Sequence, residues 1–71
     1  MKSKKVYLAC NHDRHTDDEY EIFYKEEDAK NKVREWMEHW GDSAQERAQY
    51  GDWCLIVTDD YYAFVQEVKL Q

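Results

Sequence analysis

The chain of 71 residues contains no proline, only two glycines and no long run of apolar residues. The scarcity of proline and glycine, with an aromatic content of 15%, excludes a flexible linker and a disordered chain. No apolar stretch has the length of a membrane span or a signal-peptide core, so we expect a cytoplasmic protein that does not bind membranes. In that compartment the two cysteines, Cys10 and Cys54, are expected to be thiols, with a single disulfide as the alternative.

The length predicts one domain, residues 1–71, close to the lower size limit for a chain that folds without disulfides or metal. Three Trp, six Tyr and two Phe offset that difficulty, because large aromatic side chains bury much surface per residue. The sequence contains no internal repeat and no low-complexity tract.

The stretch Glu26–Trp40 has apolar residues at helical spacing. The residues of this stripe are Ala29, Val33, Trp36, Met37 and Trp40. The spacing predicts an amphipathic helix over the whole stretch, ended by Gly41. Two indoles and a thioether are too apolar to face water, so the stripe must be covered by other elements.

Alternating or continuous apolar patterns predict four strands. These are Val6–Cys10, Glu19–Tyr24, Trp53–Thr58 and Tyr61–Leu70. A capping box at Ser43–Glu46 predicts a short helix that ends near Gly51. The order of elements predicts an α+β fold of two layers, ββα(α)ββ, with an antiparallel sheet packed on one main helix. The expected core is Val6, Leu8, Ile22, Val33, Trp36, Met37, Trp40, Leu55, Val57, Phe64 and Val68.

The net charge of −6 is concentrated in one segment. Between Cys10 and Asp28 there are eight acidic residues against Arg14 and Lys25, whereas acids and bases cancel in the rest of the chain. A phosphate backbone would be repelled by this segment, so we expect no direct binding of nucleic acid.

The acidic segment is the predicted binding site. If the loop, the second strand and the first helical turn lie close together, their carboxylates form a patch that attracts a basic protein surface. A tyrosine beside such charge is a frequent interface residue. The predicted partner-binding residues are Asp17, Asp18, Glu19, Tyr20, Glu21, Glu26, Glu27 and Asp28. The alternative is a solvated acidic rim that keeps a small protein soluble.

Cysteine and histidine residues provide a competing hypothesis. Cys10, His12 and His15, joined by Cys54, could ligate zinc, but the paired short spacings of structural zinc sites are missing. Cys10 and His12 could also act as nucleophile and base, yet no oxyanion-hole loop or phosphate-binding glycine loop accompanies them. We therefore predict no catalysis, no metal and no cofactor, and keep a small Cys/His metal-binding domain as an alternative.

The order of elements resembles that of small phage-encoded proteins. A short strand (KKVYLAC), a polar loop, a strand that leads into an acidic helix (EYEIFYKEEDAKNKVREW) and a closing strand (YYAFVQEVKL) are shared in outline with the small phage inhibitor of bacterial RNA polymerase and with several anti-CRISPR proteins. The resemblance implies a non-enzymatic inhibitor, acting as a nucleic-acid mimic, that covers a basic, nucleic-acid-binding surface of a host protein such as RNA polymerase or a CRISPR effector. A homo-oligomeric module, for example a homodimer, is the other open alternative.

Overall fold

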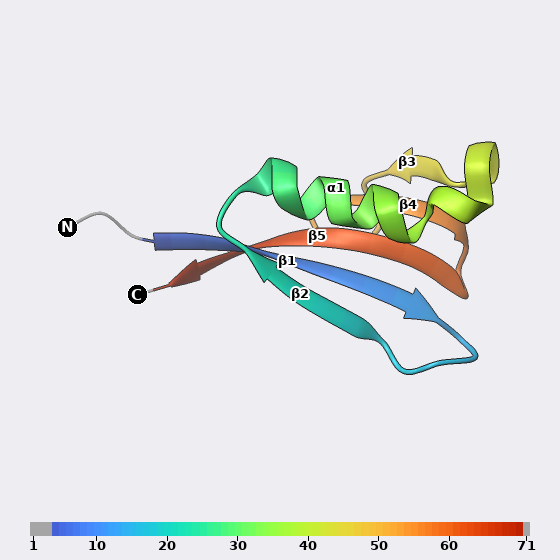
Figure 1. Cartoon of the computed structure of the whole chain (residues 1–71), viewed down its shortest axis with the longest axis horizontal. Coiled ribbons are helices and arrows are strands. Elements are labelled where there is room, and N and C mark those ends of the chain that lie inside the picture. The colour runs from blue at the N-terminus through green and yellow to red at the C-terminus, as the bar shows by residue number, and fades with distance from the viewer. Residues whose placement is uncertain (1–3, 71) are drawn as a thin grey trace.

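The computed structural model describes residues 4–70. Its elements are β1 (Lys4–Asp13), β2 (Glu19–Phe23), α1 (Glu26–Trp36), the 3-10 helix η1 (Glu38–Ser43), β3 (Gln45–Arg47), β4 (Trp53–Thr58) and β5 (Tyr61–Leu70). The strands form one antiparallel sheet in the order β2-β1-β5-β4-β3, and α1 lies across one face of it (Figure 1). The predicted α+β fold, with an antiparallel sheet packed on one main helix, is confirmed.

The centre of the sheet is a long pairing of β1 with β5, in register from Lys4↔Leu70 to Asp13↔Tyr61. β2 pairs with the outer side of β1 as the predicted hairpin, and β3 pairs with the outer side of β4. β4 is an inner strand, as its continuous apolar pattern predicts. β2 and β3 are therefore the two edges of the sheet.

Helix α1 ends at Trp36, four residues before the predicted end. The Met37 N–H still donates to the Val33 carbonyl, but the Trp40 N–H donates to Met37, which is an i→i+3 bond. The last turn of the apolar stripe therefore tightens into the 3-10 helix η1. Gly41, at φ 56°, provides the left-handed residue that lets the chain turn back toward β3.

The predicted helix between Ser43 and Gly51 is wrong. Gln45–Arg47 is instead strand β3, paired with Cys54–Ile56 of β4. Of the two alanines on its expected apolar side, Ala44 packs against the core and Ala48 is exposed. Pairing with a distant strand supplies the backbone hydrogen bonds here, and that outweighs a local capping signal with little apolar surface to bury.

The core lies between α1 and the sheet. Its most deeply buried members are Ala9, Ala29, Val33, Met37, Ala63 and Val65. Ala9 and Ala63 are neighbours on the two central strands, and their small side chains leave room for the bulky residues of the helix. Of the predicted core, six members are confirmed at this interface: Val33, Trp36, Met37, Trp40, Leu55 and Val57.

The other five predicted core residues, Val6, Leu8, Ile22, Phe64 and Val68, do not lie at this interface. The prediction is wrong for four of them, but Val6 is buried, with 7% of its surface exposed. Each of the five alternates along its strand with a residue that packs toward α1, so they lie on the opposite surface, here named the open face. β1 and β5 are apolar on both faces, and the pattern alone favoured the larger side chains. The bulky side chains of α1 instead pack against the smaller residues of these strands.

Part of the open face, at Tyr62 and Phe64 of β5, is covered by the loop between β3 and β4, residues 48–52. The Tyr50 ring stacks on Tyr62, with ring centroids 3.9 Å apart and planes 4° apart. Gly51 lies so close to Phe64 that a Cβ atom would be 2.7 Å from its ring, and its φ of +58° also favours glycine. The exposed part of the open face is at β2, where Tyr20 and Ile22 are 61% and 57% exposed, whereas Val6 and Cys10 of β1 are buried.

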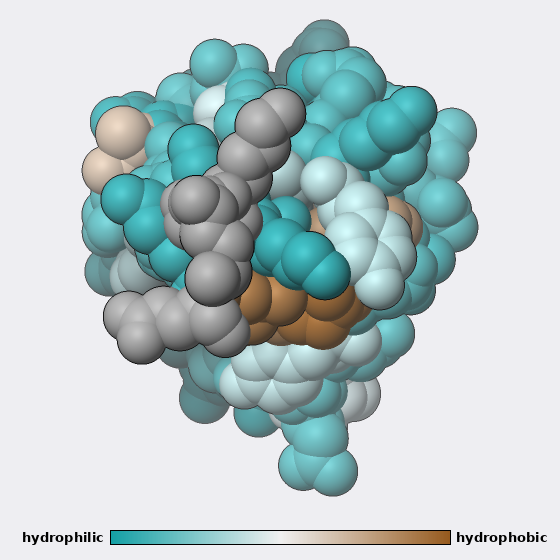
Figure 2. Space-filling view, turned by 90° about the vertical axis from the view of Figure 1, so that its left-hand side faces the viewer, coloured by the Kyte–Doolittle hydropathy of each residue, from teal (hydrophilic) through white to brown (hydrophobic). Residues whose placement is uncertain are grey.

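Seen from the end at which β1 begins and β5 ends, the molecule is mostly hydrophilic, with one small apolar area near the middle (Figure 2). No helix within residues 4–70 has the length and apolarity needed to cross a membrane.

Candidate functional site

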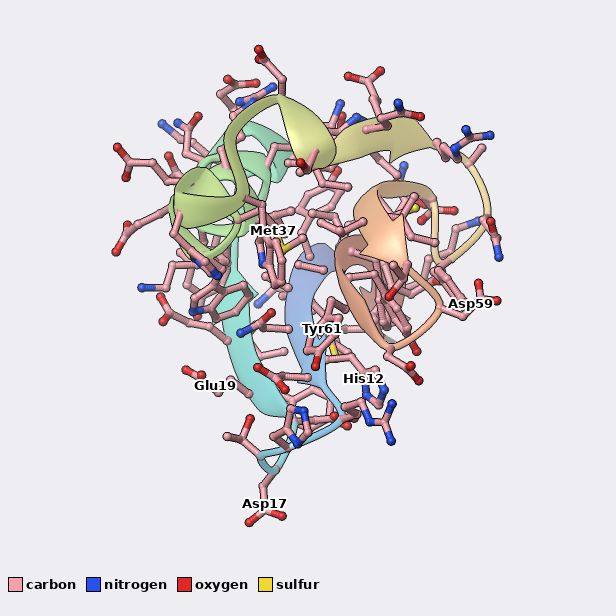
Figure 3. All side chains as sticks on the ribbon, turned by 90° about the vertical axis from the view of Figure 1, so that its right-hand side faces the viewer. His12, Asp17, Glu19, Met37, Asp59 and Tyr61 are labelled. Atoms are coloured by element: carbon pink, nitrogen blue, oxygen red, sulfur yellow. The ribbon has the colours of Figure 1, made fainter. Side chains whose placement is uncertain are left out.

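The first group of predicted binding residues lies at the tip of the β1–β2 hairpin. Asp17 is exposed and points away from the body of the molecule (Figure 3). The Asp18 carboxylate is engaged within the hairpin: His12 Nδ1 lies 2.8 Å from its Oδ1, and the Tyr20 hydroxyl donates to its Oδ2 at 3.3 Å. Asp18 therefore helps to hold the hairpin closed as well as contributing charge.

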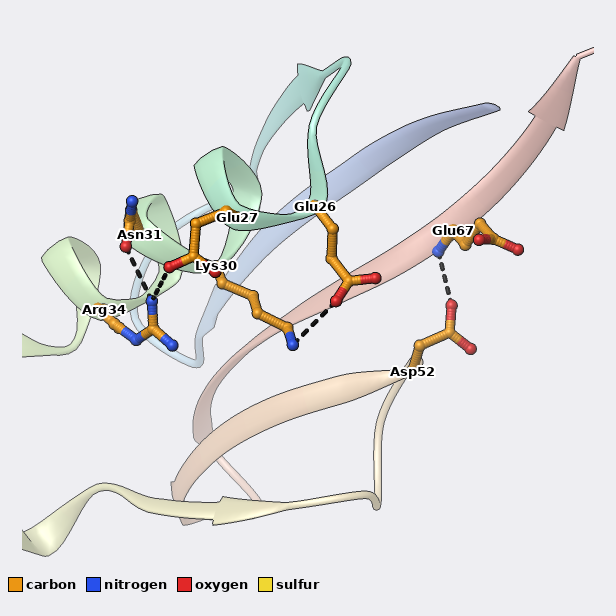
Figure 4. Close-up of polar contacts among 7 residues, drawn as sticks. All are labelled: Glu26, Glu27, Lys30, Asn31, Arg34, Asp52 and Glu67. Carbon is orange, nitrogen blue, oxygen red and sulfur yellow. Dashed lines mark hydrogen bonds and ion pairs between the residues drawn. The ribbon is translucent and has the colours of Figure 1, made fainter. Parts of the chain in front are cut away.

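The second group lies at the start of α1, where cations of the same helix meet the acids (Figure 4). Lys30 forms an ion pair with Glu26 at 2.9 Å, as its i,i+4 spacing predicts, and Arg34 pairs with Glu27 at 3.2 Å. The i,i+4 spacing of Asp28 and Lys32 predicts a further pair, but Lys32 Nζ lies 3.4 Å from Glu35 Oε1 instead. Two of the three helix-start carboxylates are thus neutralised locally.

The structure does not bring these two groups together. β2 separates them, and five extended residues span about 17 Å at roughly 3.4 Å per residue. The hairpin tip and the start of α1 consequently lie at opposite ends of β2 (Figure 1). The expectation of one compact acidic patch is wrong, because an extended strand spreads its charges along a flank.

Strand β2 itself provides the remaining predicted residues, and they are arranged more favourably. Glu19 and Glu21 point to one face of the sheet, while Tyr20 and Ile22 point to the open face, and all four are exposed. Neither glutamate forms an ion pair within residues 4–70. The edge of the sheet therefore presents free carboxylates beside exposed apolar side chains.

Two apolar members of this edge were missed by the sequence analysis. Ile22 was assigned to the core, and Tyr24, 86% exposed just after β2, is not among the predicted partner-binding residues. The alternation of Glu with apolar residues in EYEIFY was visible, but the position of the strand in the sheet was not. We name the exposed residues Glu19–Ile22 together with Tyr24 the β2 edge.

Cys10 lies beneath the open face next to this edge. Burial, with a smaller contribution from the Asp18 charge, raises the pKa of the Cys10 thiol to about 11. The charges of Cys10 and Asp18 in turn raise the pKa of the exposed Tyr20 hydroxyl above its ordinary value. At neutral pH Cys10 is therefore a protonated thiol, which is a poor nucleophile.

The cysteine and histidine residues do not form a metal centre. Cys10 and Cys54 pair with opposite sides of Phe64, so their Cα atoms are two strands apart, about 10 Å, beyond the roughly 7 Å that a disulfide can bridge. His12 stacks on Tyr62 at a centroid distance of 4.8 Å, and His15 lies against Tyr61. No three metal-ligating side chains meet in the part of the chain that the structure describes.

A hollow of about 310 Å³ lies on the helix side, between the start of α1 and strands β4 and β5. Its aromatic wall, Trp53, already carries Lys30 Nζ at 5.4 Å and Arg34 Cζ at 5.3 Å from the ring centroid. On its opposite side the Asp52 carboxylate accepts the Glu67 N–H at 2.7 Å (Figure 4). The cation-binding face of the tryptophan is thus occupied by the chain's own side chains.

Comparison with protein-family models, with curated proteins and with solved structures found no match.

Proposed function

We propose that this protein is a non-enzymatic protein-binding module whose β2 edge binds a partner with a basic surface. The observation that carries the proposal is the edge strand, on which the carboxylates of Glu19 and Glu21, without an ion pair among residues 4–70, alternate with exposed Tyr20 and Ile22. Exposed aromatic and aliphatic residues supply contact area, and the carboxylates select for lysine and arginine. Binding by occupancy needs no catalytic group, which suits a Cys10 held as a buried thiol.

The partner we propose is a host protein whose basic surface normally binds nucleic acid, such as RNA polymerase or a CRISPR effector. Its support is the net charge of −6, which opposes direct contact with nucleic acid, and the resemblance in element order to small phage inhibitors. The carboxylates of Asp17 and Asp28, unpaired within residues 4–70, extend the negative flank on both sides of the β2 edge and would speed the encounter. The reduced thiols of Cys10 and Cys54 suit the cytoplasm.

The test is a pull-down from bacterial lysate, with captured proteins identified by mass spectrometry at low and high salt. The double variant Glu19→Lys/Glu21→Lys is compared with Asp42→Lys/Glu46→Lys, which makes the same change of charge at exposed residues of η1 and β3. We expect a basic protein that the wild type and the control capture equally, and that the β2 variant captures about tenfold less. Equal capture by the two double variants would contradict the proposal.

Inhibition is tested on the captured partner directly. Its binding to labelled nucleic acid should fall as this protein is added, and should be unaffected by the Glu19→Lys/Glu21→Lys variant. A partner that binds both nucleic acid and this protein at the same time would show that its nucleic-acid surface is not the one covered.

A further inference from the structure

Backbone hydrogen bonds near Asp52 establish the direction in which the residues of the sheet present their peptide groups. The Val65 carbonyl accepts the Asp52 N–H at 2.8 Å, and the Glu67 N–H donates to the Asp52 carboxylate at 2.7 Å. The odd-numbered residues of β5 therefore direct their N–H and C=O groups toward β4. Because successive residues alternate, the even-numbered residues direct theirs toward β1.

The register between the strands then determines which residues of β2 direct their backbone groups outward. Even-numbered residues of β5 pair with even-numbered residues of β1, so the odd-numbered residues of β1, such as Ala9, face β2. Ala9 pairs with Glu21, and the backbone groups of Glu19 and Glu21 are accordingly used within the sheet. Those of Tyr20 and Ile22 point outward, where no strand of residues 4–70 pairs with them.

We propose that the β2 edge binds by strand addition. An extended segment of the partner pairs with the backbone of Tyr20 and Ile22, and this segment alternates basic with apolar residues. The inference rests on the proposed function, to which it adds the mode of binding and the pattern of the bound segment. Strand addition takes its affinity from backbone hydrogen bonds and its specificity from alternate side chains.

The alternation in the bound segment follows from the side chains of β2. Directly paired residues of neighbouring strands share a face of the sheet, so side chains opposite Glu19 and Glu21 lie beside carboxylates. Side chains opposite Tyr20 and Ile22 lie on the open face, beside exposed apolar surface. Lysine or arginine in the first set and valine or isoleucine in the second match both faces at once.

A second copy of the chain is a poorer occupant of this edge. In a two-fold symmetric dimer, β2 would pair with β2 of the other copy. If Tyr20 lies opposite Ile22, then Glu21 lies opposite Glu21; if Tyr20 lies opposite Tyr20, then Glu19 lies opposite Glu21. Like charges directly opposite each other destabilise a pair of strands. The net charge of −6 adds repulsion between copies. A basic segment neutralises both carboxylates, whereas in the remaining symmetric register, with Ile22 opposite Ile22, only Glu19 meets a base, Lys25.

The opposite edge supplies a matched control. β3 has three residues, all exposed and all polar, and by the same alternation only Glu46 directs its backbone groups outward. A short, charged edge strand is the usual protection against unwanted pairing. Blocking one outward N–H at Glu46 should therefore leave binding unaffected, whereas blocking the one at Ile22 should abolish it.

The experiment uses the full chain made by chemical synthesis and ligated at Cys10 and Cys54, with the Ile22 or the Glu46 amide nitrogen methylated. The probe is the peptide TKVRIKT, compared with TVIKRKT, which has the same composition without the alternation. We expect TKVRIKT to shift the amide NMR signals around Tyr20 and Ile22. Its affinity should fall about tenfold or more with N-methyl Ile22 and change less than about twofold with N-methyl Glu46, and the TVIKRKT peptide should bind about fivefold more weakly.

Each other outcome overturns the inference. Unchanged affinity after methylation of Ile22 rejects strand addition; if Glu19→Lys/Glu21→Lys still abolishes capture of the partner, the proposed function survives that result. A lack of TKVRIKT binding up to about 1 mM also rejects strand addition. A dimer seen by sedimentation, and dissociated by methylation at Ile22, would show that the occupant is a second copy.

Discussion

The two faces of the sheet differ in how they are covered. On one face α1 packs Ala29, Val33 and Met37 against the small side chains Ala9 and Ala63 of the central strands. On the open face the loop of residues 48–52 covers β4 and β5, and β2 remains exposed. Both the helix-covered face and the covered part of the open face therefore contribute buried residues, and the open face is exposed to solvent at β2.

This difference shows how a chain of 71 residues divides its apolar side chains. The large residues of the helix fill the space above the alanines, so the remaining large residues of the strands face the other way. Partial cover by Tyr50 and Gly51 keeps most of them from water. The strand that stays uncovered is β2, which carries more carboxylates, those of Glu19 and Glu21, than any other strand. Substitutions on the two faces should accordingly have very different effects.

The largest effect is expected for Met37→Ala, on the helix-covered face. Met37 is 3% exposed, and its truncation leaves a cavity between α1 and the sheet. We expect a loss of about 3 kcal/mol in the free energy of unfolding, measured by urea denaturation. A loss below about 1 kcal/mol would mean that this face is less tightly packed than described.

A similar but smaller effect is expected for Gly51→Ala, in the loop over the open face. The added Cβ would lie 2.6 Å from the Val65 carbonyl oxygen at a φ of +58°. We expect about 2–3 kcal/mol of destabilisation. Gly41→Ala is the matched control, since Gly41 also has a positive φ but no atom within 4 Å of the added carbon. It should cost at least about 1 kcal/mol less.

The third prediction concerns alkaline pH and Cys10 under the open face. Its pKa is raised from 9.0 to about 11, so the folded state holds the proton more tightly than the unfolded state. The stabilisation from the neutral thiol is complete below pH 9 and is lost as the pH rises through 11. Two pKa units correspond to up to about 2.7 kcal/mol. The wild type should therefore lose about 2 kcal/mol more stability than Cys10→Ala between pH 8.5 and 11. Parallel pH profiles of the two proteins would contradict the burial of this thiol.

The smallest effect on stability is expected for Ile22→Ser, at the uncovered part of the open face. Ile22 is 57% exposed, so the free energy of unfolding should change by about 0.5 kcal/mol or less. The same substitution should weaken binding of the TKVRIKT peptide, because it removes apolar contact area. A large loss of stability with unchanged peptide binding would assign Ile22 to the fold and remove it from the binding surface.

The sequence predicted the elements of this fold better than their arrangement. Period-2 and period-3.6 patterns are local, and they located α1 and the strands around Val6–Cys10 and Trp53–Thr58. The covered face of β1 could not be chosen, because Leu8 and Ala9 are both apolar and only the volume of the opposing helix decides between them. β3 could not be predicted at all, since its strand structure depends on pairing with Cys54–Ile56.

The sequence predicted which residues form the candidate site, but not how those residues are arranged in space. The sequence identified Glu19, Tyr20 and Glu21, but assumed that Asp17 and Glu27 would lie beside them. Whether acidic residues gather depends on the path of the chain, and here the hairpin tip and the start of α1 lie at opposite ends of β2. That β2 is an edge follows from β5 lying next to β1, which no local pattern reveals.

The position of β5 has a consequence for synthesis of the chain. β5 is the last of the five strands to leave the ribosome, yet it lies between β1 and β4 and joins the two hairpins into one sheet. Before β5 emerges, β1 and β4 each lack the strand that pairs with their inner side. Co-translational folding can then form only two separate hairpins, each of marginal stability. Premature termination before Tyr61 would remove the middle of the sheet rather than its margin, and such fragments should be substrates for proteolysis.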